Sequence, residues 1–165
     1  RGVGAKGPGR AGLAQLAQHG AVRTAEGAEA RAEPLGRTPD AFSDGLKSML
    51  AYGRDAPARR LVRAQHLLVE AGLAVRQALE GVDLITSPTA PQTAFSFTDA
   101  VPVNQANLTM LANISGCPAI TLPCGVAPSG LPLALQLISR PFDEAKLLGA
   151  AQILEKSWGR LFPPA

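Results

Sequence analysis

Few side chains in this 165-residue chain could serve as a nucleophile, a general base or a metal ligand. The cysteines, Cys117 and Cys124, do not form a CxxC pair, and they could be reduced structural thiols, a disulfide or metal ligands. The histidines, His19 and His66, are isolated, which leaves no His-Cys or His-Asp arrangement. We therefore favour reduced, buried structural thiols, and we expect no metal site and no cofactor.

Two polar residues lie where a ligand could bind. Thr89 ends a short apolar strand, and open α/β sheets bind ligands beyond their strand ends. Its hydroxyl could instead terminate the strand through a local hydrogen bond. Asn113 follows a segment expected to be a short helix, where its amide could bond the backbone of the next turn. Thr89 and Asn113 are our candidate substrate-binding residues.

The strands that would position these residues are short, apolar and bounded by proline. Prolines between residues 113 and 140, among them Pro118, Pro123 and Pro132, exclude a helix there, because each fixes φ and lacks a backbone donor. Residues 120–122 and 133–138 are therefore expected to be buried strands, joined by a turn over residues 124–130. Within that turn, Gly125 is expected at a positive φ, so that Gly125→Val would damage folding.

Apolar periodicity and helix start and stop signals predict five helices, over residues 24–33, 40–52, 57–80, 104–111 and 143–156. We expect Asp40 to cap the second helix and Gly53 to end it, and Val22 to be the remnant of a strand. A third strand is expected over residues 83–86, ended by Pro88. This alternation of strands and helices predicts an α/β protein, with a mixed β-sheet flanked by helices.

Composition narrows the class of protein. The chain is 46% apolar, enough for the core of one domain. Residues 1–76 hold twelve Lys and Arg against seven Asp and Glu, but these charges are scattered and lack aromatic platforms, so we expect no nucleic-acid partner. Apolar runs are too short for a membrane span, and no signal-peptide pattern opens the sequence. A cytoplasmic protein without a membrane partner is expected.

The region from Phe42 to Trp158 resembles the amidase signature hydrolases. Their C-terminal part reads Asn-x-x-Gly-x-Pro-Ala, an apolar strand, Pro-x-Gly, a turn, Gly-Leu-Pro and a strand containing Gln. The matching residues here are Asn113, Gly116, Pro118, Ala119, Pro123, Gly125, Gly130, Leu131, Pro132 and Gln136. Residues 83–91 are similar to the family's strand from Asp to Pro-Thr-x-Pro, and Asp143-Glu144 opens a helix in the expected place.

The resemblance implies the C-terminal part of an amidase domain over residues 41–165, preceded by a poorly ordered or partial N-terminal segment over residues 1–40. Such enzymes cleave amide C–N bonds with a Ser nucleophile, a second Ser and a Lys base, in the family's N-terminal half. This chain has no adjacent serines and no Gly-Ser-Gly run. Its catalytic residues and a missing N-terminal half are thus expected outside the 165 residues, and the chain alone is expected to be inactive.

Departures from the glutamine-using branch of the family bear on the small-molecule amide substrate. The glutamine-using subunit of tRNA-dependent amidotransferases has an Asp and an Arg that suit the α-amine and α-carboxylate of glutamine. The corresponding positions here are Asn107 or Ala106, and Met49 or Ser48. The chain therefore resembles a stand-alone amidase more than that subunit. The alternative is a non-catalytic interaction module, or a pseudo-enzyme remnant that keeps only the sheet, and a homodimer stays open.

Overall fold

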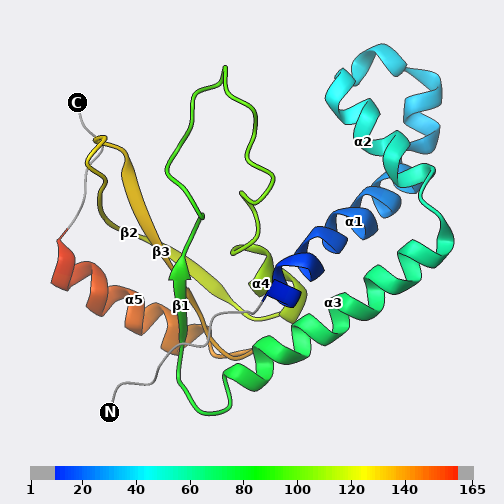
Figure 1. The fold of residues 1–165 in the computed structure, drawn as a ribbon. Coiled ribbons are helices and arrows are strands. Elements are labelled where there is room, and N and C mark those ends of the chain that lie inside the picture. The colour runs from blue at the N-terminus through cyan, green and yellow to red at the C-terminus, as the bar shows by residue number, and fades with distance from the viewer. Residues whose placement is uncertain (1–9, 160–165) are drawn as a thin grey trace. The chain divides into compact units, whose positions relative to one another are not determined.

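The structure, a computed structural model, describes the backbone of residues 10–159 and the side chains of residue 22 and residues 24–159. The chain divides into two compact units, which meet between Ala71 and Gly72. The first unit is helical, whereas the second contains the sheet and two helices that pack on it (Figure 1). The expected domain boundary near residue 40 stays a prediction.

The first unit is built from α1 (Arg10–Arg37), the 3₁₀ turn η1 (Pro39–Ala41), α2 (Asp44–Arg54) and most of α3 (Ala58–Ala78). Helices α1 and α2 pack at very short range. A side chain on the buried Gly53 would overlap the backbone carbonyl of Thr24, so glycine at this position permits the contact.

Two expectations about the first unit were wrong. Helix α1 begins at Arg10 rather than Thr24, so Val22, expected as a strand remnant, is a buried helical residue. Nothing between Arg10 and Thr24 disfavours a helix strongly enough to end it. Pro34 lies in the last turn, and the helix ends three residues after it.

The start and end of α2 also differ from expectation. Its N-cap is Ser43, whose Oγ accepts a hydrogen bond from the Leu46 amide at 3.3 Å, whereas Asp40 lies in η1. Phe42, which lies between η1 and Ser43, is extended, and it separates the 3₁₀ turn from the helix. Gly53 does not end α2, because it is the contact point with α1.

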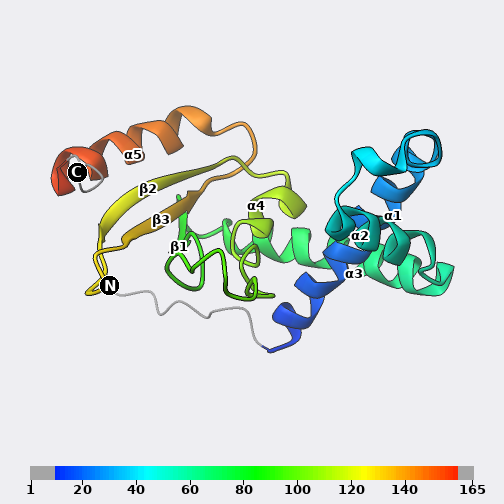
Figure 2. The same ribbon diagram turned by 90° about the horizontal axis from the view of Figure 1, so that it is seen from above.

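The second unit contains a three-stranded antiparallel sheet in the order β1-β3-β2. Its strands are β1 (Ile85–Pro88), β2 (Ala119–Val126) and β3 (Pro132–Ile138), and the last strand in the chain lies in the middle. Helix α5 (Glu144–Trp158) lies along one face, whereas α4 (Met110–Ser115) lies on the opposite side (Figure 2). The α/β class is confirmed, as is the β2–β3 pair.

Alternation along β3 gives the sheet two different faces. On the α5 side, an apolar cluster is formed by Leu122, Leu137, Leu147 and Ala151. On the other side, Ile138 packs with Leu79, Ala112 and Cys117. Each fully buried leucine contributes about 1.5–3 kcal/mol, so both clusters hold helices against the sheet.

The hairpin turn is tighter than expected. Strand β2 continues through a bulge at Cys124 to Val126, and the reversal is closed by a hydrogen bond from the Ala127 amide to the Leu131 carbonyl at 2.8 Å. The glycine with positive φ is Gly130, at +82°, so the expectation for Gly125 was wrong. Gly125 lies in the strand, and open space surrounds the position its side chain would take.

Strand β1 is shifted two residues beyond the expected range and includes Pro88. Among the residues that the structure describes it pairs only with β3, so it is an edge strand of this sheet, where a missing backbone donor is tolerated. Helix α4 begins at Met110, because residues 104–109 form turns. It ends at Ser115, beyond the expected end, and so contains Asn113. Helices α3 and α5 end within about two residues of expectation.

Candidate functional site

A row of polar side chains crosses the sheet on the face opposite α5. In the register of the sheet, Gln136 of the central strand lies between Ser87 of β1 and Thr121 of β2. Gln136 and Thr121 share a face, because their neighbours in sequence carry apolar side chains directed at α5. Ser87 is on the same face, because it pairs directly with Gln136. This row is the candidate functional site, since it collects hydrogen-bonding groups beside the expected position of Thr89.

Thr89 joins one end of this row. Its amide donates to the Ala134 carbonyl at 3.0 Å, which extends the β1–β3 pairing by one residue. Its hydroxyl donates to the Thr121 hydroxyl at 3.3 Å. The expected alternative, a local bond that terminates the strand, is wrong, because these partners are 32 residues apart in sequence. Thr121 is exposed and keeps its own proton available for another acceptor.

Asn113 lies in α4, exposed and without a side-chain hydrogen bond within residues 10–159. The expected bond to the next turn of backbone is therefore absent from the described structure. The end of α4 is fixed instead by Ser115 and Gly116: the Ser115 hydroxyl donates to the Leu111 carbonyl at 2.7 Å, and Gly116 adopts φ +66°. Within the described residues, no hydrogen bond joins Asn113 to Thr89.

Helix α4 is held closely against the part of α3 that belongs to the same unit. The Arg76 guanidinium donates to the Ser115 carbonyl at 2.8 Å, where α4 ends. A side chain on Gly72 would lie 2.6 Å from the Ile114 carbonyl oxygen, so the backbones approach closely. These contacts hold the C-terminal end of the helix carrying Asn113 against α3.

Other groups that could do chemistry are already engaged in structural contacts or lack partners. Lys146 pairs with Asp83 and Asp143, each at 3.1 Å, and hydrogen bonds to these two carboxylates raise its pKa. It is thus held protonated and cannot serve as a neutral base at physiological pH. Cys117 and Cys124 are both free thiols, but only Cys117 is buried, so the expectation of burial was wrong for Cys124. Among residue 22 and residues 24–159, no group of three His, Cys, Asp or Glu could hold a metal ion.

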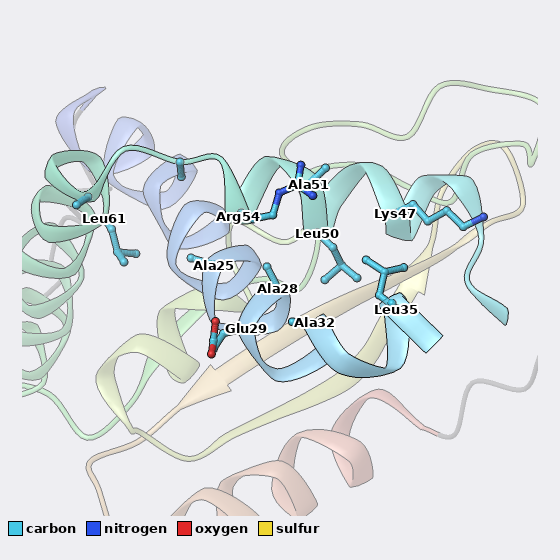
Figure 3. Close-up of a pocket in the computed structure, with 14 residues that line it drawn as sticks. Ala25, Ala28, Glu29, Ala32, Leu35, Lys47, Leu50, Ala51, Arg54 and Leu61 are labelled. Atoms are coloured by element: carbon cyan, nitrogen blue, oxygen red, sulfur yellow. The ribbon is translucent and has the colours of Figure 1, made fainter. Parts of the chain in front are cut away.

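The first unit has a pocket of about 740 Å³ between α1, α2 and the start of α3. Figure 3 shows Leu35 and Leu50 reaching into it from α1 and α2. Half of its other lining residues are alanines, and its two lining cations are paired, Arg54 with Asp55 and Lys47 with Asp44. The pocket offers a mostly apolar surface, and Glu29 is the one carboxylate among its lining residues.

Sequence reasoning found Thr89 but missed Ser87 and Thr121 as its neighbours. The signal was present: each is a small hydroxyl residue that interrupts a short strand of apolar or β-branched residues. Which hydroxyls would share a face depended on the register of β1 against β3, and that register could not be read from residue types.

No helix within the described residues is both long and apolar enough to cross a membrane.

Comparison with solved structures identifies the class of fold. The crystal structure of an amidase matches with a TM-score of 0.77 and 21% identity, over 89% of this chain and 36% of that one. The structure of 6-aminohexanoate cyclic dimer hydrolase complexed with substrate matches with a TM-score of 0.69 and 23% identity, over 92% of this chain and 37% of that one. The chain therefore has an α/β fold of the amidase type.

Sequence comparison identifies the family. The amidase family model matches residues 18–148. A glutamyl-tRNA(Gln) amidotransferase subunit of Thermodesulfovibrio yellowstonii is 42% identical over 94 residues, which cover 53% of this chain and 19% of that protein. The chain belongs to the amidase family, and the resemblance to amidase signature hydrolases is confirmed. It spans only about a fifth of the length of the curated relatives it matches.

Proposed function

We propose that this chain is the C-terminal part of an amidase that hydrolyses a carboxylic amide C–N bond, with its Ser-Ser-Lys catalytic residues outside the chain. The family match over residues 18–148 carries this proposal. The small share of its relatives that the chain spans supports a catalytic half elsewhere. The cytoplasmic location and the open question of a homodimer stay predictions.

In the proposed reaction, the nucleophilic serine attacks the amide carbonyl while a neutral lysine takes its proton through the second serine. Backbone N–H groups stabilise the oxyanion, the amine leaves with a proton, and water then hydrolyses the acyl-enzyme. Our chain would supply the sheet beneath this site and part of the pocket for the acyl group. Thr89 and Asn113 are the proposed substrate-binding residues, with the Thr121 hydroxyl beside Thr89.

Two substrate classes can be separated. A non-glutamine amide is favoured because two charged groups that would recognise glutamine are replaced. Asn107 or Ala106 takes the place of the carboxylate, and Met49 or Ser48 takes the place of the guanidinium. Glutamine is the second candidate, because the curated relatives include glutamyl-tRNA(Gln) amidotransferase subunits at 38–42% identity. Both candidates require the same catalytic residues, so the substrate alone distinguishes them.

The test compares the chain alone with the chain co-expressed with an amidase N-terminal half that carries the Gly-Ser-Ser run. Alone, we expect no turnover of simple amides, glutamine included, and no labelling by a serine-directed sulfonyl fluoride, because deleting a catalytic serine typically costs about a million-fold. With the partner, we expect labelling of the partner's serine and turnover of non-glutamine amides. Stoichiometric labelling of the 165-residue chain would contradict the proposal, and association without any turnover would favour the interaction module.

The matched variants are Thr89→Val and Asn113→Ala, assayed in the co-expressed pair. Each should raise KM for the favoured amide while the partner's serine is still labelled. Asn104→Ala is the control, since Asn104 is also exposed but lies six residues before α4. An unchanged KM in both matched variants would remove Thr89 and Asn113 from the proposed site.

A further inference from the structure

Gln136 is one of few polar side chains that the second unit buries almost completely. It is 3% exposed, in the middle strand of the sheet. A buried amide is costly unless its donors and acceptors are satisfied, so its partners indicate why an amide is present. Its Nε2 donates to the Leu108 carbonyl at 3.1 Å and approaches the Ser87 hydroxyl at 3.5 Å.

These partners belong to the two segments that carry the proposed substrate-binding residues. Ser87 precedes Thr89 by two residues on β1, and Leu108 precedes α4, the helix that contains Asn113. The Leu108 carbonyl also accepts the Leu111 amide at 3.3 Å, in the turn where α4 begins. The Gln136 amide therefore touches the start of α4 and the end of β1 at once.

The connecting segment, residues 90–109, has no comparable attachment. Its other hydrogen bonds are local, such as those of Ser96 with Thr98 and Asp99. Within the described residues, the Gln136–Leu108 bond is the only hydrogen bond that ties this segment to the sheet. Gln92, in the same segment, has a buried Nε2 without a hydrogen-bond partner among those residues. Its buried amide therefore does not attach the segment to the sheet.

We propose that Gln136 is a positioning residue, which sets the place of α4 and Asn113 relative to Thr89 through its hydrogen bond to the Leu108 carbonyl. The proposal rests on the proposed function for the role of those two residues. Gln136 itself is buried under the segment and is not proposed to touch substrate. The bond has a specific chemical requirement, a donor at this position in the strand.

Hydrogen exchange of the 165-residue chain tests this requirement without any catalytic assay. Gln136→Met keeps the length of the side chain but removes the donor. We expect the amides of residues 110–117 to exchange about tenfold faster than in the wild type, while the β2–β3 amides keep their protection. Gln92→Met is the control, and it should leave both regions unchanged, since no hydrogen bond is lost.

Gln136→Glu adds a signature that a purely structural role would not produce. Above its pKa the buried carboxylate faces the Leu108 carbonyl without a donor, and below it the protonated carboxyl donates through its O–H group. Relative to the wild type at the same pH, exchange of residues 110–117 should be at least about tenfold faster near pH 8 and close to the wild-type rate near pH 5. Gln136→Met should show no such recovery.

Equal acceleration of exchange in all regions, or none in residues 110–117, would overturn the proposal. In the active pair, Gln136→Met should raise KM more than it lowers kcat, and Gln136→Glu should recover the wild-type KM as the pH falls. If exchange changes locally but Thr89→Val and Asn113→Ala leave KM unchanged, the positioning bond stands and the proposed substrate site fails. The two hypotheses are thus tested separately.

Discussion

The two units of the chain are stabilised by different kinds of contact. In the first, α1 and α2 approach so closely that a single added carbon at Gly53 would overlap backbone. In the second, side chains donate to backbone carbonyls far away in sequence: Arg76 to Ser115, Gln136 to Leu108, and Arg140 to Leu79 and Val82. The first unit should therefore be sensitive to added volume at Gly53, and the second to lost donors. The second unit also has one close backbone contact, between Gly72 and the Ile114 carbonyl.

The largest effect is expected for Gly53→Ala. The new methyl group would overlap the Thr24 carbonyl, and the helices must separate to admit it, which should lower the free energy of unfolding by about 3 kcal/mol. Urea unfolding followed by circular dichroism measures the loss. Gly45→Ala is the control on the same helix, where the position is open, and it should stabilise by up to about 1 kcal/mol. Equal effects of the two substitutions would refute the close contact.

A smaller loss is expected for Arg140→Met in the second unit. The Arg140 guanidinium donates to the Leu79 carbonyl at 3.0 Å and to the Val82 carbonyl at 2.8 Å, so it satisfies groups left at the end of α3. Removing it should cost about 2 kcal/mol in urea unfolding. Arg76→Met removes the single bond to Ser115 and should cost about half as much. A larger cost for Arg76→Met would contradict this ranking.

The hairpin gives a third, smaller contrast. Gly130→Val places a β-branched residue at φ +82°, which should cost about 1–2 kcal/mol. Gly125→Val should change stability by less than about 0.5 kcal/mol, because Gly125 lies in β2 with open space around its side-chain position. Thermal melts of the two variants measure the difference. The reverse order would restore the sequence-based assignment of the turn.

The smallest effect concerns Lys146 and depends on pH. Its folded-state pKa is raised by hydrogen bonds to Asp83 and Asp143, so its stabilisation is fully present below the unfolded pKa of about 10.4 and is lost as pH rises through the folded value. The difference in urea midpoint between the wild type and Lys146→Met should therefore stay constant up to about pH 9. Above about pH 10.5 this difference should shrink toward zero. Lys156→Met is the control, because Lys156 has no ion pair in the described structure. A midpoint difference for Lys146→Met that widens with rising pH would contradict the raised pKa of Lys146.

Much of the second unit could be predicted from local sequence. The β2–β3 hairpin follows from short apolar runs bounded by proline, and α5 from its acidic start at Asp143-Glu144. The helix start was placed at Thr24 because the residues before it are rich in Ala and Gly and hold few large apolar side chains that could mark a helical stripe. Gly53 was interpreted as a helix stop because a glycine needed for close packing is indistinguishable in sequence from one needed for a turn.

The candidate site was predictable only in part. Thr89 was found from its place after an apolar strand, and Gln136 was noted as a motif residue without a role. The contact of Thr89 with Thr121, and of Gln136 with Leu108, depends on strand register and on how residues 90–109 return to the sheet. Such long-range contacts leave no periodic pattern, so residue types alone could not reveal them.

The strand order also governs the sequence of events in folding. Strand β3 lies between β1 and β2, so Ile85 must wait for Ile138, more than fifty residues later, before it can pair. The β2–β3 hairpin, with its five-residue reversal, is a local contact that forms within microseconds once both strands exist. Docking of β1 closes a far longer loop and should be the slower step. During synthesis on the ribosome, β1 therefore cannot pair with β3 until the residues up to Ile138 have emerged.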